Sequence, residues 1–146
     1  MVSRDLEGVF PRLRDTGYII TSPSTPDYNC IAWAAGETNR WWWPVRGSFA
    51  YWPSGAPLQE TLEAFVQAFA ALGFAHCDDP RIEDGFEKIA IYIDDNGQPT
   101  HAARQLPTGR WTSKLGKCED IEHELEGLTA SCYGSVARIL KRPVRL

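Results

Sequence analysis

Three runs of β-forming residues, separated by two tight turns, constrain the fold of this chain more than any other feature. Residues 86–94 alternate apolar and polar side chains and are rich in Ile, Tyr and Phe, so they predict a strand. The segment Asp95-Asn96-Gly97 that follows is typical of a hairpin turn, because Asn and Gly tolerate the positive φ angles of such turns. Residues 100–106 and 110–115 predict two further strands, joined by a second turn at 107–109. The sequence therefore predicts an antiparallel three-stranded meander.

Helices are expected on both sides of this meander along the chain. They are indicated by apolar side chains at helical spacing. Asn29 or Asp27 is a candidate N-cap of the helix that begins at residue 30, and glycines mark the C-terminal ends of two of the expected helices. The expected helices span residues 6–13, 30–36, 57–73, 119–128 and 133–140. No internal repeat or linker divides the chain, so we expect a single α+β domain over residues 1–146.

Charge and hydropathy argue against two classes of partner. The 146 residues carry a formal net charge of −4, and nucleic-acid binding needs a basic face, so no nucleic-acid role is expected. There is no run of about eighteen apolar residues, so no membrane association is expected. Residues 1–14 lack the apolar core of a secretory signal. We therefore expect a cytoplasmic protein whose four cysteines are free thiols.

Cys30 and His101 are the residues whose expected positions suit catalysis. A helix N-terminus places partial positive charge beside a thiol and lowers its pKa, which favours the nucleophilic thiolate. An imidazole on a strand packed across that helix end would lower the thiol pKa further and would pass a proton to the leaving group. Backbone N–H groups at the start of the helix would hold a developing oxyanion. The alternative is that Cys30 is a buried, unreactive thiol and His101 is a core or surface histidine.

The residues around this pair resemble a known superfamily. The block Asn-Cys-Ile-Ala-Trp-Ala at 29–34 is followed by Thr-His-Ala-Ala-Arg-Gln at 100–105 and by Gly-Arg-Trp-Thr-Ser-Lys-Leu-Gly at 109–116. This order resembles the papain-like cysteine peptidases and amidases, in particular their compact bacterial members of the NlpC-like kind. The resemblance implies a papain-like core, in which an N-terminal nucleophile-bearing helix packs on a small antiparallel sheet, with C-terminal helices added. It also implies that Cys30 is the nucleophile and His101 the base.

The resemblance implies a third, polar residue that orients the imidazole, and here the chain departs from the family pattern of His, Asn, Asp or Gln. Ser113 on the third expected strand would lie opposite His101, and Asp120 just beyond that strand is the charged alternative. Asn29 would cap the helix or face the site. Tyr28 would donate a hydrogen bond to the oxyanion or would pack in its loop.

Tryptophans are concentrated between Trp41 and Trp52, which contain four of the six in the chain. Aromatic surfaces bind extended peptides or sugars, so one interpretation is that this segment lines a substrate cleft. The alternatives are that it packs over the core or contacts a partner protein. The candidates for a substrate cleft are Trp33, Trp42, Trp43 and Trp111.

Metal and phosphate chemistry are not expected. Zinc ligands are present by type at His76, Cys77, Cys118, His123 and Cys132, but no C-x-x-C pair occurs and His123 falls within an expected helix. No glycine-rich phosphate loop occurs either, so no cofactor is expected.

Two functions follow as hypotheses. The first is a thiol hydrolase or acyltransferase, in which Cys30 attacks an amide or peptide-type bond of a peptide or protein substrate and His101 moves the proton. The second is a catalytically inactive protein-binding module on the same scaffold, which uses the Trp-rich segment 41–52 as its partner surface.

Overall fold

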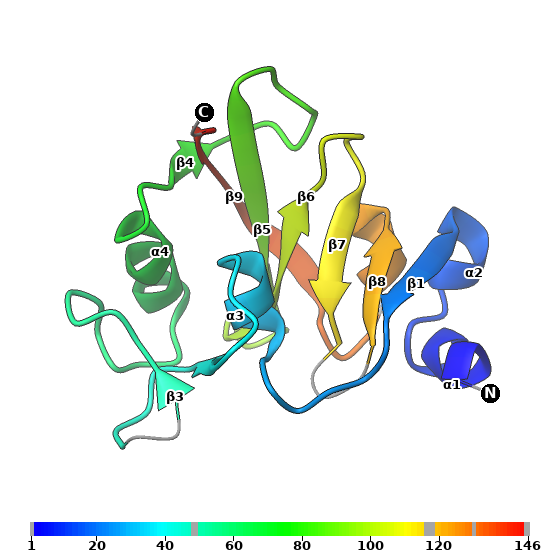
Figure 1. Cartoon of the computed structure of the whole chain (residues 1–146), viewed down its shortest axis with the longest axis horizontal. Coiled ribbons are helices and arrows are strands. Elements are labelled where there is room, and N and C mark those ends of the chain that lie inside the picture. Colours follow the sequence, from blue (N-terminus) through cyan, green and yellow to red (C-terminus); the bar gives the residue numbers. More distant parts are fainter. Residues whose placement is uncertain (1, 48–49, 116–118, 130, 145–146) are drawn as a thin grey trace.

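The computed structural model describes residues 2–47, 50–115, 119–129 and 131–144, with side chains from Leu6 onward. Its centre is a seven-stranded sheet in the order β1-β8-β7-β6-β5-β9-β4, and each strand runs antiparallel to its neighbours (Figure 1). The strands of this sheet are β1 (Tyr18–Ser22), β4 (Ala75–Cys77), β5 (Phe86–Ile93), β6 (Pro99–Gln105), β7 (Trp111–Lys114), β8 (Asp120–His123) and β9 (Ser135–Pro143). Two short strands, β2 (Trp41–Trp42) and β3 (Ala50–Tyr51), form a separate parallel pair.

The middle of the sheet is apolar on both of its faces. In β5, Ile89 and Ile91 belong to one core cluster, while Ala90 and Tyr92 belong to another, and all four are fully buried. Successive side chains of a strand point to opposite faces, so the two clusters lie on the two faces of the sheet. A strand that is buried on both faces needs a sheet that is covered on both sides.

One face, which we call the α3 face, is covered by α3 (Cys30–Ala34) and α4 (Leu62–Ala70). Phe65 and Phe69 of α4 pack in the same cluster as Ile91 of the sheet. In Figure 1, α3 lies in front of the sheet and α4 lies beyond it, toward β4. This face therefore receives the helix that begins at the candidate nucleophile.

The opposite face, which we call the η1 face, is covered by α1 (Val2–Val9), α2 (Leu13–Thr16) and the 3₁₀ helix η1 (Leu125–Leu128). Leu13 and Leu128 are fully buried in its cluster. The N-terminal residues thus complete the core on the side away from α3.

The expected fold class is wrong. The chain is not a papain-like α+β core with a nucleophile-bearing helix on a small sheet and added C-terminal helices. It is mainly an antiparallel sheet of seven strands with short helices, and α4 has nine residues. Within the described residues, no helix is both long and apolar enough to cross a membrane.

The two C-terminal helices account for much of this error. Residues 119–128 hold β8 and η1, and residues 133–140 lie mostly within β9. Ile121 and Leu125 have helical spacing, but Ile121 and His123 also alternate as the buried residues of a strand. β9 is a strand because β5 and β4 pair with it on both sides, and such contacts between distant segments override local propensity.

The predicted meander is confirmed. β5, β6 and β7 are consecutive antiparallel neighbours, and the turns between them contain Gly97 at φ 81° and Gly109 at φ 93°. These angles lie in the left-handed region that glycine adopts without steric cost.

The predicted helix starts are partly right. α3 begins at Cys30, with Asn29 as its N-cap, as predicted. The helix expected from residue 57 begins later, at Leu62, because Thr61 caps it by accepting from the N–H of Ala64. The helix expected over 6–13 is divided into α1 and α2, with Pro11 between them.

Candidate functional site

Asn29 holds the start of α3 against the Trp-rich segment. Its Oδ1 accepts from the N–H of Ala32, at 3.1 Å, and from the N–H of Trp42, also at 3.1 Å. Its Nδ2 donates to the carbonyl of Trp42 at 2.9 Å. All of these bonds are internal to the protein, so Asn29 acts as a structural cap that joins α3 to β2.

Cys30 is the first residue of α3, which is the position expected of a nucleophile, but its side chain is buried. Only 7% of the residue is exposed, and it packs in the cluster of the α3 face. Burial raises the pKa of the Cys30 thiol to about 11, although backbone N–H groups of Ala102, Ile31 and Cys30 and the charge of Lys114 lower it. Desolvation therefore outweighs the helix start, and the thiol is protonated at neutral pH.

His101 lies in β6 and is fully buried. Its ring stacks on Tyr133, with ring centres 4.1 Å apart, and meets the edge of Tyr92 at 5.4 Å. Its Nε2 lies 2.9 Å from Oγ of Ser113. The contact expected between His101 and Ser113 from their strands is thus present.

A chain of hydrogen bonds continues from Ser113 to His123, and it fixes both imidazole tautomers. Nδ1 of His123 lies 2.7 Å from the carbonyl of Glu124, which only accepts, so this nitrogen carries the proton. Nε2 of His123 must then accept from Ser113, at 2.7 Å, and the serine oxygen accepts from Nε2 of His101. Nδ1 of His101 is left as a buried acceptor without a partner among the described residues.

Burial keeps both of these histidines neutral. Desolvation, followed by the nearby His123, lowers the pKa of His101 well below its ordinary value. Desolvation also lowers the pKa of His123 to about 4, against the opposing effect of the Glu124 carbonyl. Two neutral rings bridged by a hydroxyl form a satisfied core network apart from one nitrogen.

The sheet separates Cys30 from His101. Ala102 shares the α3-face cluster with Cys30, while Ala103 belongs to the cluster of the η1 face. Because β6 alternates, His101 points the same way as Ala103, and its partners Tyr92 and Tyr133 lie with the η1-face cluster. The structure therefore brings together His101 and Ser113 but places the candidate nucleophile on the other side of the sheet.

Tyr28 and Asp120 form a second buried pair, on the same side as Cys30. The hydroxyl of Tyr28 donates to Oδ2 of Asp120 at 2.6 Å, and both residues are buried. Burial, with the hydrogen bond and charge of Asp120, raises the pKa of Tyr28. Lys114 lies opposite Asp120 on β7, with its Nζ 5.3 Å from the centre of the Tyr28 ring. Asp120 thus binds Tyr28 and does not orient His101, and the Tyr28 proton is not aimed at an oxyanion.

The four tryptophan candidates do not line one cleft. Trp42 is buried and stacks on Phe69 of α4, and Trp43 meets Phe65 edge-on. Trp33 stacks on Tyr28 and donates from Nε1 to Thr112 at 3.0 Å, while Trp111 is buried on the η1 face. These indoles contribute to packing on two sides of the molecule.

No set of three or more metal-binding side chains gathers within the described residues. His123 is buried in β8, His76 and Cys77 lie in β4, and Cys132 is exposed in a turn. Cys118 lies outside the described residues.

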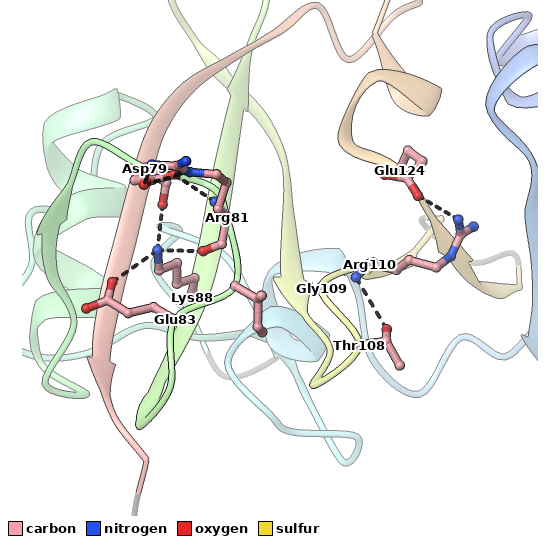
Figure 2. A pocket seen from close by; sticks show the side chains of 9 residues that line it. Asp79, Arg81, Glu83, Lys88, Thr108, Gly109, Arg110 and Glu124 are labelled. Atoms are coloured by element: carbon pink, nitrogen blue, oxygen red, sulfur yellow. Dashed lines mark hydrogen bonds and ion pairs between the residues drawn. The ribbon is translucent and has the colours of Figure 1, made fainter.

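A wide hollow of about 670 Å³ opens at one end of the sheet, and sequence reasoning missed it. Figure 2 shows its charged lining: Lys88 points toward Glu83 on one side, and Arg110 meets Glu124 on the other. Nζ of the fully buried Lys88 donates to the carbonyls of Asp79 and Arg81, at 2.7 and 2.8 Å, and lies 3.3 Å from Glu83.

The charged side chains that line this hollow form ion pairs with one another. Arg81 binds Asp79 at 2.7 Å, and Arg110 binds Glu124 at 2.6 Å. The available sequence signal for this hollow was the pair of cations, Arg81 and Lys88, within and after the polar run 76–85. Because its charges are already paired, the hollow offers little unused capacity to a charged ligand.

The edge of the sheet at β1 exposes two large apolar side chains that are neighbours in sequence. Ile19 and Ile20 are 57% and 41% exposed, and as neighbours in a strand they point to opposite faces. Within the described ranges, β1 pairs with β8 and with no second strand. β1 contains no charged residue and no proline.

Comparison with known proteins gives a family match that covers most of the chain. Residues 19–141 match the model of a family described as a domain of unknown function, DUF7689. The matched region begins within β1 and ends within β9, so α1 and α2 lie outside it. Curated proteins and solved structures give no match. The chain therefore belongs to the DUF7689 family of unknown function.

Proposed function

We propose that this chain is a protein-binding module that adds an extended segment of a partner to the free edge of its sheet at β1. The observation that carries the proposal is the exposure of Ile19 and Ile20 on an uncharged strand at that edge. Strand addition supplies main-chain hydrogen bonds, and alternate side chains of the added strand pack beside those of the edge.

The two edges of the sheet differ in a way that supports this proposal. Native sheets usually protect an edge by making it short, charged or covered, or by placing proline in it. β4, at one edge, has three residues, whereas β1 has five residues and neither charge nor proline; its register with β8 is irregular only between Ile20 and Ser22, toward its end. Five residues extend over about 17 Å, which suits a short peptide rather than a large interface.

Cys30 and His101 are not part of this proposal. A thiol hydrolase needs its base within hydrogen-bond reach of the nucleophile, and here the sheet lies between the two. The Trp-rich segment is not the partner surface in this proposal, because Trp42 and Trp43 pack on α4.

The experiment selects peptides from a random displayed library on the whole immobilised chain and measures their affinity by fluorescence anisotropy. Replacing Ile19 by Lys should weaken binding at least about tenfold, because a buried Ile contact contributes about 1.5–3 kcal/mol. The matched control is Leu58→Lys, which changes another exposed apolar residue, outside the strands, and should leave the affinity unchanged.

Two further readouts separate strand addition from other contacts. Peptides methylated at alternate backbone nitrogens should lose binding, since the added strand donates from its N–H groups. Amide hydrogens along β1 should exchange more slowly when the peptide is bound. Selected peptides that bind Ile19→Lys and the parent chain equally would contradict the proposal.

A further inference from the structure

A second hollow, of about 290 Å³, lies where β5 begins and β6 ends. The loop before β5 and the residue after β9 complete it. Its lining combines the apolar side chains of Ile82, Phe86, Pro107 and Val144 with Gln105 and three carboxylates. It shares Ile82 and Glu83 with the wide hollow of Figure 2, but its lining is more apolar than the charged lining of that hollow.

The walls of this second hollow are largely apolar. Ile82 and Val144 are two of the few large hydrophobic side chains that the described fold leaves exposed, and both lie here. Phe86 and Pro107 add an aromatic ring and a rigid apolar ring to the lining. Small-molecule sites typically combine such walls with a few fixed polar groups.

Gln105 supplies a fixed acceptor in this lining. The residue is only 6% exposed, and its Nε2 donates to the carbonyl of Pro80 at 2.7 Å and to that of Gly109 at 3.4 Å. Because carbonyls only accept, these bonds determine which end of the amide is nitrogen. Its Oε1 is then a buried acceptor without a partner among the described residues.

The carboxylates of the hollow divide into two kinds. Glu83 is bound by Lys141 at 2.9 Å, and Glu87 is bound by Arg142 at 3.1 Å. Asp84 is exposed and forms no ion pair within the part of the chain that the structure describes. Two side chains of the lining therefore keep unused hydrogen-bonding capacity, Asp84 and Gln105 through its Oε1, and both groups are acceptors.

We propose that this second hollow binds an alkylammonium or alkylguanidinium group. The apolar stem lies against Ile82, Phe86 and Val144, and the cationic head donates to Asp84 at the rim and to Gln105 within. A neutral alcohol of the same length gains the apolar contact but leaves the carboxylate without a counter-charge. This site is independent of strand addition at β1, because β8 and β7 lie between β1 and the two strands, β6 and β5, that line the hollow.

The test titrates the isotope-labelled full chain by nuclear magnetic resonance with three probes: butylguanidinium, N-acetylarginine methylamide and 1-pentanol. We expect saturable shifts at the amides of residues 82–87 and 105, with both cations binding at least fivefold more tightly than the alcohol. Tighter binding of N-acetylarginine methylamide than of butylguanidinium assigns the ligand to a protein side chain. The reverse order assigns it to a small amine or guanidine.

Asp84→Asn provides the decisive variant, because the residue is exposed and its replacement leaves the core intact. It should weaken both cations at least fivefold and leave pentanol unchanged. Asp95→Asn, an exposed carboxylate in the turn after β5, is the matched control and should change neither. Equal affinity for the alcohol and the cations, or cation binding that Asp84→Asn does not weaken, would overturn the proposal.

Discussion

Lowering the pH from 7 to 5 should destabilise this protein through the hydrogen-bonded chain of His101, Ser113 and His123. Both imidazoles are fully buried and neutral, with their tautomers fixed by the carbonyl of Glu124. The unfolded chain binds protons on these histidines near pH 6.5, whereas burial lowers both pKa values in the folded chain. The unfolded state therefore gains protons first, and stability is lost as the pH falls below about 6.5.

The size of the effect follows from the pKa of His123, which falls from 6.5 to about 4 on folding. Linkage then gives a loss of about 2 kcal/mol in the free energy of unfolding between pH 7 and pH 5. His101 contributes in the same direction, because its folded pKa is also lowered by burial. Carboxylates, with ordinary pKa values of about 4, change little in this interval, so the two histidines dominate it.

Urea unfolding at pH 7, 6 and 5, followed by tryptophan fluorescence, measures this free energy. The control variant His76→Asn removes the exposed histidine of β4 and its ion pair with Asp78 but keeps the buried network, so the fall in stability toward pH 5 should persist in it. His123→Leu should lower stability at pH 7 but make the fall toward pH 5 smaller by about 2 kcal/mol. A free energy of unfolding that is the same at pH 5 and pH 7 would refute the reasoning, since it requires histidines that protonate in the fold.

Two further predictions concern backbone fit and thiol reactivity. Gly134→Ala should destabilise the fold far more than Gly97→Ala. Both glycines have φ of 81°, which costs alanine about 1–2 kcal/mol. Only at Gly134 would the added Cβ also collide with another segment, since it would lie 2.8 Å from the carbonyl carbon of Ile93. Urea unfolding of the two variants checks this, and equal losses would show that the predicted collision is absent. Iodoacetamide at pH 8 should label the exposed Cys132 at least about 100-fold faster than Cys30, whose thiol is buried with a pKa of about 11. Peptide mass spectrometry measures both rates, and rapid labelling of Cys30 would restore it as a candidate nucleophile.

Local signals in the sequence predicted the meander correctly because its strands are consecutive and its turns have specific chemistry. Asn96-Gly97 and Thr108-Gly109 each place a glycine where the structure has positive φ. The N-cap at Asn29 was also local, since an Asn accepts from the N–H of a residue three positions later. Features determined within a few residues could therefore be read without coordinates.

Features that depend on distant partners could not be read in this way. β9 contains helix-forming residues such as Ala137 and Leu140, yet it is a strand because it lies between β5 and β4. β8 lies between β7 and β1, and β1 comes almost 100 residues earlier in the chain. Such pairings depend on the whole sheet rather than on the propensity of one segment.

The candidate site does not assemble because His101 points away from α3. A residue on a strand next to α3 points either toward that helix or away from it, and a change of one position reverses every side chain. In β6 the small Ala102 faces Cys30, so His101 faces the opposite cluster, where Ser113 and Tyr133 contact it. The order of a cysteine helix followed by a histidine strand contains no information on this alternation. The buried network on the η1 face uses His101, so a shift of β6 that turned this imidazole toward Cys30 would break its hydrogen bond to Ser113. The serine hydroxyl would keep its bond to His123 but would lose the donor to its oxygen, so the fold opposes the pairing that the sequence order suggested.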